Sequence, residues 1–482
     1  MTETLDTLYV DGGWCPAADG STFEVTDPAS GEVIHRVASG GKADVQLAIA
    51  AAERALPVWS AATAYQRAEV LLKAHRLMLE RSEDLAQLMT REQGKPIKAA
   101  RTEVKYAADF LIWFAEEAKR VYGQTIPSAR EDQRFLVMHQ PVGVVGAVTP
   151  WNYPISMITR KVAPAIAAGC TIVLKPAEQT PLCAVAVFEI LHEAGVPAGV
   201  ANLVTAEDPE PIGTEFLTNP AIAKLTFTGS TAVGRMLARE AAGQMKRVSM
   251  ELGGHAPFIV FGDADPEHAA KGAALVKLLN AGQACISPNR IFVHRSIRDE
   301  FVNVLTKRVS GMKVGQGLID GVTVGPLIDS DAMDRMEQQV ADAVAKGATV
   351  ETGGTRLIDD GLAGGHFFAP TVLTGVTEEM RIYREETFGP IAPVIVFDDD
   401  DDVVAMANDT DYGLASYVYT QNLSKALRTA EGLRFGMVGI NDINPTSAAA
   451  PFGGMKQSGL GREGAQEGLL EYLETKLVGI SV

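Results

Sequence analysis

The sequence predicts an α/β protein built from two adjacent layers, and three observations support this. Strand-like and helix-like segments alternate through most of the chain, the apolar strands fall into two series, and helical segments rich in Ala, Leu, Glu and Arg fill residues 43–120. Alternating strands and helices form a parallel sheet with helices on both faces. Because 482 residues exceed what one simple core supports, two or three domains are expected.

The first series of predicted strands runs from residue 143 to residue 228. Its members are short and apolar, as buried strands are: Gly143–Thr149, Thr171–Leu174, Ala201–Val204 and Lys224–Thr228. Helical patterns separate or follow these strands at Ile155–Ala168, Ala184–Ala194 and Thr231–Ala242. We expect these βα units to form one parallel sheet.

A second series of strands follows, at Pro257–Phe261, Arg290–His294, Ala392–Phe397 and Gly436–Ile440. Two more segments, Arg134–Gln140 and Leu477–Val482, have strand patterns but stand outside the βα order. Strands of this kind are either ordinary edge strands or templates for pairing with another chain.

The composition excludes several classes of function. A net charge of −17 argues against a nucleic-acid partner held through phosphate contacts. Four cysteines without regular spacing fit neither a disulfide framework nor a zinc site, and the acidic run Asp398–Asp402 is more typical of a solvated turn and helix start than of a metal site. Residues 1–11 have no signal-peptide pattern, and the apolar runs are too short or interrupted to span a bilayer. We therefore expect a cytoplasmic protein with no metal, nucleic-acid or membrane partner.

Cys285 is the strongest candidate for a chemically active residue. It stands among small and polar residues in Asn280-Ala-Gly-Gln-Ala-Cys-Ile-Ser-Pro-Asn-Arg290, whereas Cys170 and Cys183 lie among apolar residues and Cys15 is expected in a polar N-terminal turn. Residues 273–280 form an apolar helical pattern that the following Ala-Gly pair ends, which can leave the thiol accessible. A reactive cysteine needs access and a stabilised thiolate. Taken alone, a structural cysteine is an equal alternative.

Two features together predict a dinucleotide site. In Phe227-Thr-Gly-Ser-Thr-Ala-Val-Gly234 a Gly-rich turn follows a strand and opens a helix, the setting in which backbone N–H groups bind a phosphate. In Leu174-Lys-Pro-Ala-Glu178 a cation and a carboxylate emerge at the carboxyl end of a neighbouring strand, where open α/β sheets bind ligands. A carboxylate there can accept hydrogen bonds from ribose hydroxyls. Either feature alone is an ordinary surface turn.

Three more polar residues stand at constrained positions. Glu251 lies between two apolar residues, and partial burial would raise its pKa toward the range of a general base. Asn152 is flanked by prolines in Thr149-Pro-Trp-Asn-Tyr-Pro154, so its side-chain amide could donate to a developing oxyanion. Glu386 begins the rigid turn Glu386-Thr-Phe-Gly-Pro390.

Taken together, these segments resemble the aldehyde dehydrogenase superfamily, and the resemblance covers essentially the whole chain. Seven motifs follow the family's order: Pro150-Trp-Asn, Lys175-Pro-Ala-Glu, Phe227-Thr-Gly-Ser, Glu251-Leu-Gly-Gly, Gly282-Gln-Ala-Cys, Glu386-Thr-Phe-Gly-Pro and Pro451-Phe-Gly-Gly. The resemblance implies a homodimer or homotetramer with a Rossmann-like NAD-binding domain, an α/β catalytic domain, a small β element for oligomerisation and a segment that returns to the cofactor domain. Their respective limits are 1–121 with 141–250, 251–440, 122–140 with 465–482, and 441–464.

The resemblance also implies roles for individual residues. The Cys285 thiolate adds to an aldehyde, Asn152 and the Cys285 backbone N–H hold the oxyanion, and Glu251 activates the water that hydrolyses the thioester. Lys161 and Glu463 relay protons to Glu251. The dinucleotide is held by Trp151, Lys175, Glu178, Gly229, Ser230, Glu386 and Phe388. Because the Glu178 carboxylate would repel a 2′-phosphate, NAD is expected in preference to NADP.

Within the superfamily, Met157-Ile-Thr-Arg-Lys161 and the tail Pro451–Glu463 are most similar to succinate-semialdehyde dehydrogenases. In those enzymes an arginine at the place of Arg160 binds the substrate carboxylate, and Leu279 stands where a second such arginine is usual. We therefore expect NAD-dependent oxidation of a short semialdehyde such as succinate semialdehyde. A neutral aliphatic or aromatic aldehyde is the alternative substrate. A cysteine hydrolase and a non-catalytic nucleotide-binding protein are alternatives from other classes.

Overall fold

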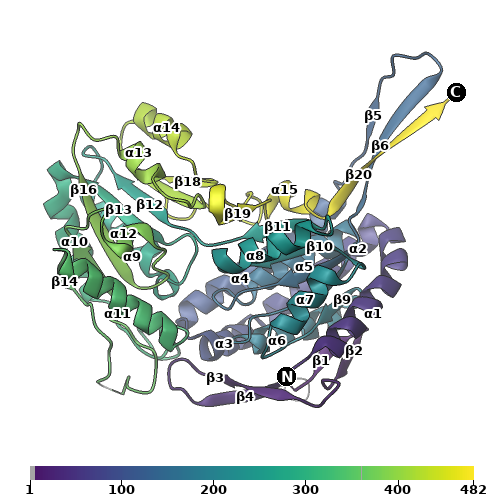
Figure 1. Cartoon of the computed structure of the whole chain (residues 1–482), viewed down its shortest axis with the longest axis horizontal. Coiled ribbons are helices and arrows are strands. Elements are labelled where there is room, and N and C mark those ends of the chain that lie inside the picture. The colour runs from purple at the N-terminus through teal and green to yellow at the C-terminus, as the bar shows by residue number, and fades with distance from the viewer. Residues whose placement is uncertain (1–5, 360) are drawn as a thin grey trace.

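The computed structural model describes residues 6–359 and 361–482, and it has the predicted α/β architecture (Figure 1). An eight-stranded and a seven-stranded sheet form the two layers, accompanied by a three-stranded sheet and the hairpin β3 (Thr22–Thr26) and β4 (Val33–Ala38). Residues 1–5, which begin the segment where we expected no signal peptide, lie outside the described residues. Within the described ranges, no helix is long and apolar enough to cross a membrane.

The eight-stranded sheet contains the first predicted series of strands. In spatial order it consists of β19 (Gly459–Leu460), β11 (Arg247–Glu251), β10 (Ile222–Thr228), β7 (Val144–Val148), β8 (Thr171–Lys175), β9 (Ala201–Leu203), β1 (Leu8–Val10) and β2 (Gly13–Cys15). The five strands from β11 to β9 are parallel, and β7 lies between β8 and β10. The chain therefore builds the sheet outward from β7 in both directions. Ligands of open α/β sheets bind outside the carboxyl ends of the strands at such a switch point.

Nine helices of the described chain accompany this sheet: α1 (Lys42–Ala61), α2 (Ala64–Glu80), α3 (Ser82–Gln93), α4 (Ile97–Ala118), α5 (Ser156–Ala168), α6 (Pro181–Ala194), α7 (Glu210–Thr218), α8 (Thr231–Ala242) and α15 (Ala465–Leu470). The first four confirm the helical region predicted for residues 43–120. Helix α5 is buried along its whole length and packs against α4, α2 and β8. Any charge that α5 carries must therefore be paired inside the protein.

The seven-stranded sheet contains the second predicted series. Its order is β14 (Thr349–Thr352), β15 (Thr371–Thr374), β16 (Ile391–Phe397), β13 (Pro288–His294), β12 (Ala256–Val260), β17 (Ala415–Tyr419) and β18 (Met437–Ile440), parallel except at β14. Its helices are α9 (Pro266–Leu278), α10 (Arg298–Ser310), α11 (Ser330–Ala345), α12 (Arg381–Arg384), α13 (Val403–Asn408) and α14 (Leu423–Gly432). Asp402 caps α13 by accepting from the Ala405 backbone N–H, which confirms the acidic run as a turn and helix start.

The two strands predicted outside the βα order pair with each other. Strand β6 (Gln133–Pro141) lies antiparallel to β20 (Leu473–Ser481), with Val137 opposite Leu477, and β5 (Gln124–Ile126) pairs with the other edge of β6. The three strands project from the body of the molecule in Figure 1. The division of the chain into domains stays a prediction.

The structure corrects two local predictions near cysteines. The helix expected to reach Asn280 ends at Leu278, because Asn280 and Ala281 have φ angles of 51° and 56°, which an α-helix does not allow. A 3₁₀ turn over Leu279–Gly282 follows and leads to Cys285. Cys15, expected in a turn, is the last residue of β2.

Candidate active site

The carboxyl ends of β7, β8 and β10 bring the predicted dinucleotide residues to one edge of the first sheet. Lys175 ends β8 and is buried, and its Nζ lies 2.6 Å from an oxygen of the half-exposed Glu178 carboxylate. Ser230 follows β10 and caps α8, with its Oγ accepting from the Val233 N–H at 3.4 Å. A Cβ added at Gly229 would lie 2.5 Å from the Phe227 ring, so this turn requires glycine.

Glu386 and Phe388 come from the second sheet and reach the first. The Glu386 Oε1 accepts from the Gly254 N–H at 2.8 Å, and burial raises the pKa of this carboxyl to about 7. The Phe388 ring meets the Trp151 ring edge-to-face, with 5.6 Å between centroids. Since Trp151 follows β7, this aromatic pair joins the two layers at the predicted cofactor site.

The Cys285 thiol lies half-buried after the 3₁₀ turn, against the core of the second sheet. Burial raises the pKa of the thiol to about 12, although the Arg160 guanidinium acts in the opposite direction. The resting thiol is therefore neutral near pH 7. Cys170 and Cys183 are fully buried, as their apolar surroundings predicted.

Asn152 is buried beside the turn that leads to Cys285. Its side-chain Nδ2 donates to the Gln283 backbone carbonyl at 3.1 Å, and its own carbonyl accepts from the Asn280 Nδ2 at 3.0 Å. The predicted oxyanion donor is thus held against a residue two positions before the predicted nucleophile.

Glu251 ends β11 and is buried, and within the described chain neither of its carboxylate oxygens has a hydrogen-bond partner. A Cβ added at Gly453 would lie 2.8 Å from its Oε1, so the carboxyl rests against the Pro451-Phe-Gly-Gly segment. Burial and the nearby Glu463 carboxylate raise the pKa of Glu251 well above its usual range. Strongly perturbed carboxyls in such surroundings are candidates for proton transfer.

Arg160 and Lys161, both on α5, converge on Glu463. The Lys161 Nζ lies 2.5 Å from Glu463 Oε1 and 3.0 Å from the Thr226 hydroxyl. The Arg160 Nε lies 3.0 Å from Glu463 Oε2 without hydrogen-bond alignment, and its guanidinium stacks 4.0 Å over the Phe452 ring. Although burial opposes it, the two cations hold the pKa of Glu463 below its usual range.

The Arg160 guanidinium can therefore donate further hydrogen bonds. Of the residues that the structure describes, none accepts a hydrogen bond from its Nη2, and the side chain is 1% exposed. A buried guanidinium with a free donor is suited to an anionic group.

Comparison with known proteins shows the family and the fold. Residues 14–478 match the aldehyde dehydrogenase family. A glutarate-semialdehyde dehydrogenase of Pseudomonas putida is 51% identical over 474 residues, covering 98% of this chain and 97% of that protein. The succinate-semialdehyde dehydrogenase (NADP⁺) GabD of Escherichia coli K12 is 49% identical over 473 residues, covering 98% and 97% respectively. A crystal structure of succinate-semialdehyde dehydrogenase from Burkholderia pseudomallei superposes with a TM-score of 0.97 at 48% identity, covering 100% of this chain and 99% of that chain.

The chain belongs to the aldehyde dehydrogenase family. This confirms the predicted family, the predicted fold class and the prediction of an NAD(P)-dependent oxidoreductase that acts on an aldehyde. The relatives do not confirm the expected preference for NAD, since the E. coli enzyme is named for NADP⁺.

The site of this aldehyde dehydrogenase fits a dinucleotide. The glycine at position 229 leaves only backbone at the start of α8, where N–H groups and the helix dipole favour a phosphate. The Glu178 side chain is 36% exposed and can accept hydrogen bonds from a ribose. The Trp151 and Phe388 rings, which contact each other edge-to-face, add an apolar surface at the segment after β7.

Sequence reasoning missed a buried ion pair in this aldehyde dehydrogenase, between Lys95 and Glu103. Lys95 stands between Gly94 and Pro96 in the break between α3 and α4. Glu103 interrupts the apolar face of α4 that Ala100, Val104, Ala107 and Leu111 form. A carboxylate on the core face of a helix was the signal that could have identified the pair.

Proposed function

We propose that this enzyme oxidises a short semialdehyde, such as succinate semialdehyde, to the corresponding dicarboxylic acid, with NAD as cofactor. The substrate class rests on Arg160, a buried cation whose Nη2 has no hydrogen-bond acceptor among the described residues and whose charge acts on the Cys285 thiol. A carboxylate bound there would hold the distal end of a short aldehyde near the thiol. The names of the relatives agree with this substrate class.

The reaction begins at Cys285. The thiol, which is neutral at rest, first gives up its proton to solvent, which is one of the two protons that the reaction releases. The thiolate then adds to the aldehyde carbon, and the oxyanion of the resulting thiohemiacetal is held by the Asn152 amide and the Cys285 N–H. One such donor typically lowers the barrier by about 3–4 kcal/mol. Bound NAD supplies the acceptor for the hydride that leaves the adduct, and a thioester on Cys285 remains.

Glu251 is the general base in the second half of the reaction, the hydrolysis of the thioester. It takes a proton from water as the water attacks the thioester, which releases the acid and restores the thiol. Lys161 and Glu463 pass that proton onward, an assignment that the 2.5 Å contact between them supports. The balanced reaction converts the aldehyde, water and NAD⁺ to the carboxylate, NADH and two protons.

The Glu178 carboxylate supports a binding preference for NAD over NADP. It lies at the end of β8 where a ribose would bind, and a negative charge there opposes a 2′-phosphate. Lys175 neutralises part of that charge at 2.6 Å, so we expect a preference rather than an exclusion.

The projecting sheet supports association of this chain with a copy of itself, as a homodimer or homotetramer. Strand β20 is an edge strand, and apolar side chains on it are exposed, with Leu477 at 61%. Exposed apolar edges of this kind are usually covered by another chain. We also retain the cytoplasm as the proposed compartment.

Substitution of Arg160 tests the substrate class. Arg160→Leu should lower kcat/KM for succinate semialdehyde by about 1.5–3 kcal/mol, roughly 10- to 150-fold, the range for a hydrogen bond to a charged group. Butyraldehyde, of equal carbon number but uncharged, should lose much less. It loses only the effect of the Arg160 charge on the Cys285 thiol and on Glu463, whereas the charged aldehyde also loses the contact with its carboxylate. Arg160→Lys is the control that keeps the charge, and Leu279→Arg should raise the preference for the charged aldehyde. An equal loss with both aldehydes would show that Arg160 is structural and favour a neutral substrate.

A further inference from the structure

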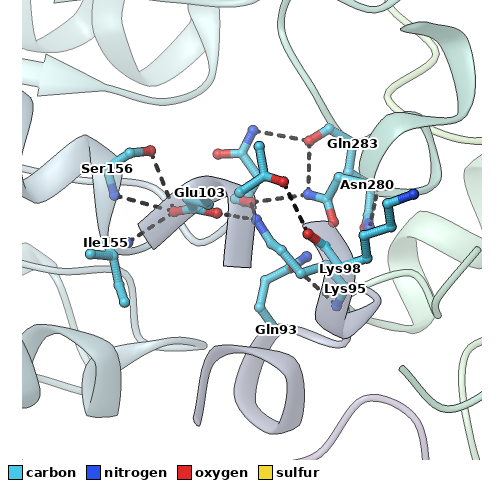
Figure 2. Close-up of polar contacts among 10 residues, drawn as sticks. Gln93, Lys95, Lys98, Glu103, Ile155, Ser156, Asn280 and Gln283 are labelled. Atoms are coloured by element: carbon cyan, nitrogen blue, oxygen red, sulfur yellow. Dashed lines mark hydrogen bonds and ion pairs between the residues drawn. The ribbon is translucent and has the colours of Figure 1, made fainter. Parts of the chain in front are cut away.

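A buried lysine links the start of α4 to the segment that carries Asn152. Lys95 is 2% exposed, and its ammonium forms an ion pair with Glu103. The same ammonium donates to the backbone carbonyl of Asn152 at 2.8 Å and lies 4.1 Å from the centre of the Tyr153 ring. Figure 2 shows Lys95 with Glu103 on one side and Asn280 and Gln283 on the other.

Glu103 holds the far end of the same segment. Its Oε1 accepts hydrogen bonds from the backbone N–H of Ile155 at 3.1 Å, the backbone N–H of Ser156 at 3.2 Å and the Ser156 hydroxyl at 3.3 Å. Residues 152–156 are therefore fixed at both ends by one ion pair from α4 and the loop before it (Figure 2).

The turn before Cys285 joins this network from the opposite side. The Asn280 Nδ2 donates to the Asn152 carbonyl that Lys95 also contacts, and the Gln283 carbonyl accepts from the Asn152 side chain. Gln283 is itself fixed, since its side-chain Oε1 accepts from the Ile328 N–H at 2.9 Å. The Asn152 carbonyl thus has two donors, one from each layer of the molecule.

The energetics indicate that this network fixes the position of the Asn152 backbone rather than adding to the stability of the fold. Removing a lysine and a glutamate from water costs several kcal/mol per ion, and well-packed apolar residues often stabilise a protein equally well. What an apolar pair cannot do is fix a carbonyl oxygen and three donors at defined distances. Such fixed geometry matters most where a reacting group must be aligned.

We infer that Lys95 and Glu103 are positioning residues for the oxyanion donor. By fixing the backbone of Asn152, they set its side-chain amide relative to Cys285 before the aldehyde arrives. Neither residue touches the substrate, so they act through Asn152. The inference rests on the proposed function, in which Asn152 holds the oxyanion and Cys285 is the nucleophile.

A double-mutant cycle tests the inference. Lys95→Met, Asn152→Ala and the double variant are compared by the rate of the NADH burst at saturating NAD and succinate semialdehyde, with butyraldehyde in parallel. We expect Lys95→Met to slow the burst roughly 10- to 100-fold, less than loss of the donor itself, with KM for the aldehyde nearly unchanged. The double variant should be no slower than Asn152→Ala, because residues that act through one group are not additive.

Glu103→Gln is the second arm, since the amide retains the size and an acceptor oxygen and should fold where Lys95→Met does not. It should slow the burst in the same way. Lys246→Met is the matched control: this buried lysine also donates to backbone carbonyls, of Asn219 and Ile222, but at the opposite end of β11. It should lower the melting temperature without slowing the burst.

The outcomes distinguish failure of the proposed function from failure of the positioning role of Lys95 and Glu103. If Asn152→Ala keeps the wild-type burst, the oxyanion assignment is wrong and the inference fails with it. If Asn152→Ala is slow but the Lys95 and Glu103 variants are not, or if the losses add, the ion pair is only structural and the inference alone is overturned.

Discussion

At the scale of single residues, burial sets the chemistry of this site. Glu251 has no hydrogen-bond partner within the described chain, and its pKa is raised well above the usual range because the charged form is desolvated. The carboxyl is therefore protonated at acidic pH and becomes a base as the pH rises through its raised pKa. The pKa of the Cys285 thiol is raised for the same reason, to about 12.

We predict that Glu251→Gln separates the two halves of the reaction. The NADH burst should survive, while steady-state turnover falls about 10²- to 10⁴-fold, the usual contribution of a general base. In the wild type, thioester hydrolysis should accelerate with rising pH, and the glutamine variant should lose that acceleration. Stopped-flow absorbance of NADH at several pH values measures both phases. A variant with the wild-type steady-state rate and pH profile would remove Glu251 from this role.

At the scale of elements, the pairing of β6 with β20 extends an apolar strand into solvent. Leu477 on β20 is 61% exposed, and Met138 on β6 is 45% exposed. We predict that Leu477→Asp shifts the protein toward smaller assemblies in light scattering, because a carboxylate would be buried without a partner. Leu423→Asp on α14, where the native leucine is 71% exposed, is the control and should leave the molar mass unchanged. If the Leu477→Asp variant keeps the molar mass of the unmodified protein, as the control should, then β20 does not form the interface.

At the scale of the whole molecule, the proposed cofactor site is assembled from both layers. Glu178 and Trp151 come from the first sheet, and Glu386 and Phe388 from the second, with contacts between the layers at Gly254 and Trp151. A ligand that binds only this assembled site stabilises the folded state in proportion to its affinity.

We therefore predict that NAD raises the melting temperature more than NADP does at equal concentration. Glu178→Ser should bring the rise in melting temperature with NADP closer to the rise with NAD. The variant should bind NADP more tightly, because the charge that repels the 2′-phosphate is gone. Glu300→Ser, at an exposed position on α10, is the control. Larger stabilisation of the unmodified protein by NADP would refute the proposed role of Glu178 and match the NADP⁺ named for the E. coli relative.

The sequence by itself determined the family, the fold class and the positions of most strands and helices. Runs such as Thr171–Leu174 are predicted correctly because a short run of β-branched and apolar residues between turn residues is the local pattern of a buried strand. Helix α8 has the bounds that its pattern gave, Thr231–Ala242. The setting of Cys285 among small residues was also visible, since it is a property of adjacent residues.

Only the tertiary structure decided how the charged residues are paired. Lys161 meets Glu463 across 302 positions, and Lys95 meets Asn152 across 57. Within the part of the chain that the structure describes, the Arg160 Nη2 and the Glu251 carboxylate have no hydrogen-bond partners, and this too depends on neighbours that are distant in the chain. Periodicity records which face of an element is buried, but the partner of a buried charge is set by packing between elements, which no local pattern encodes.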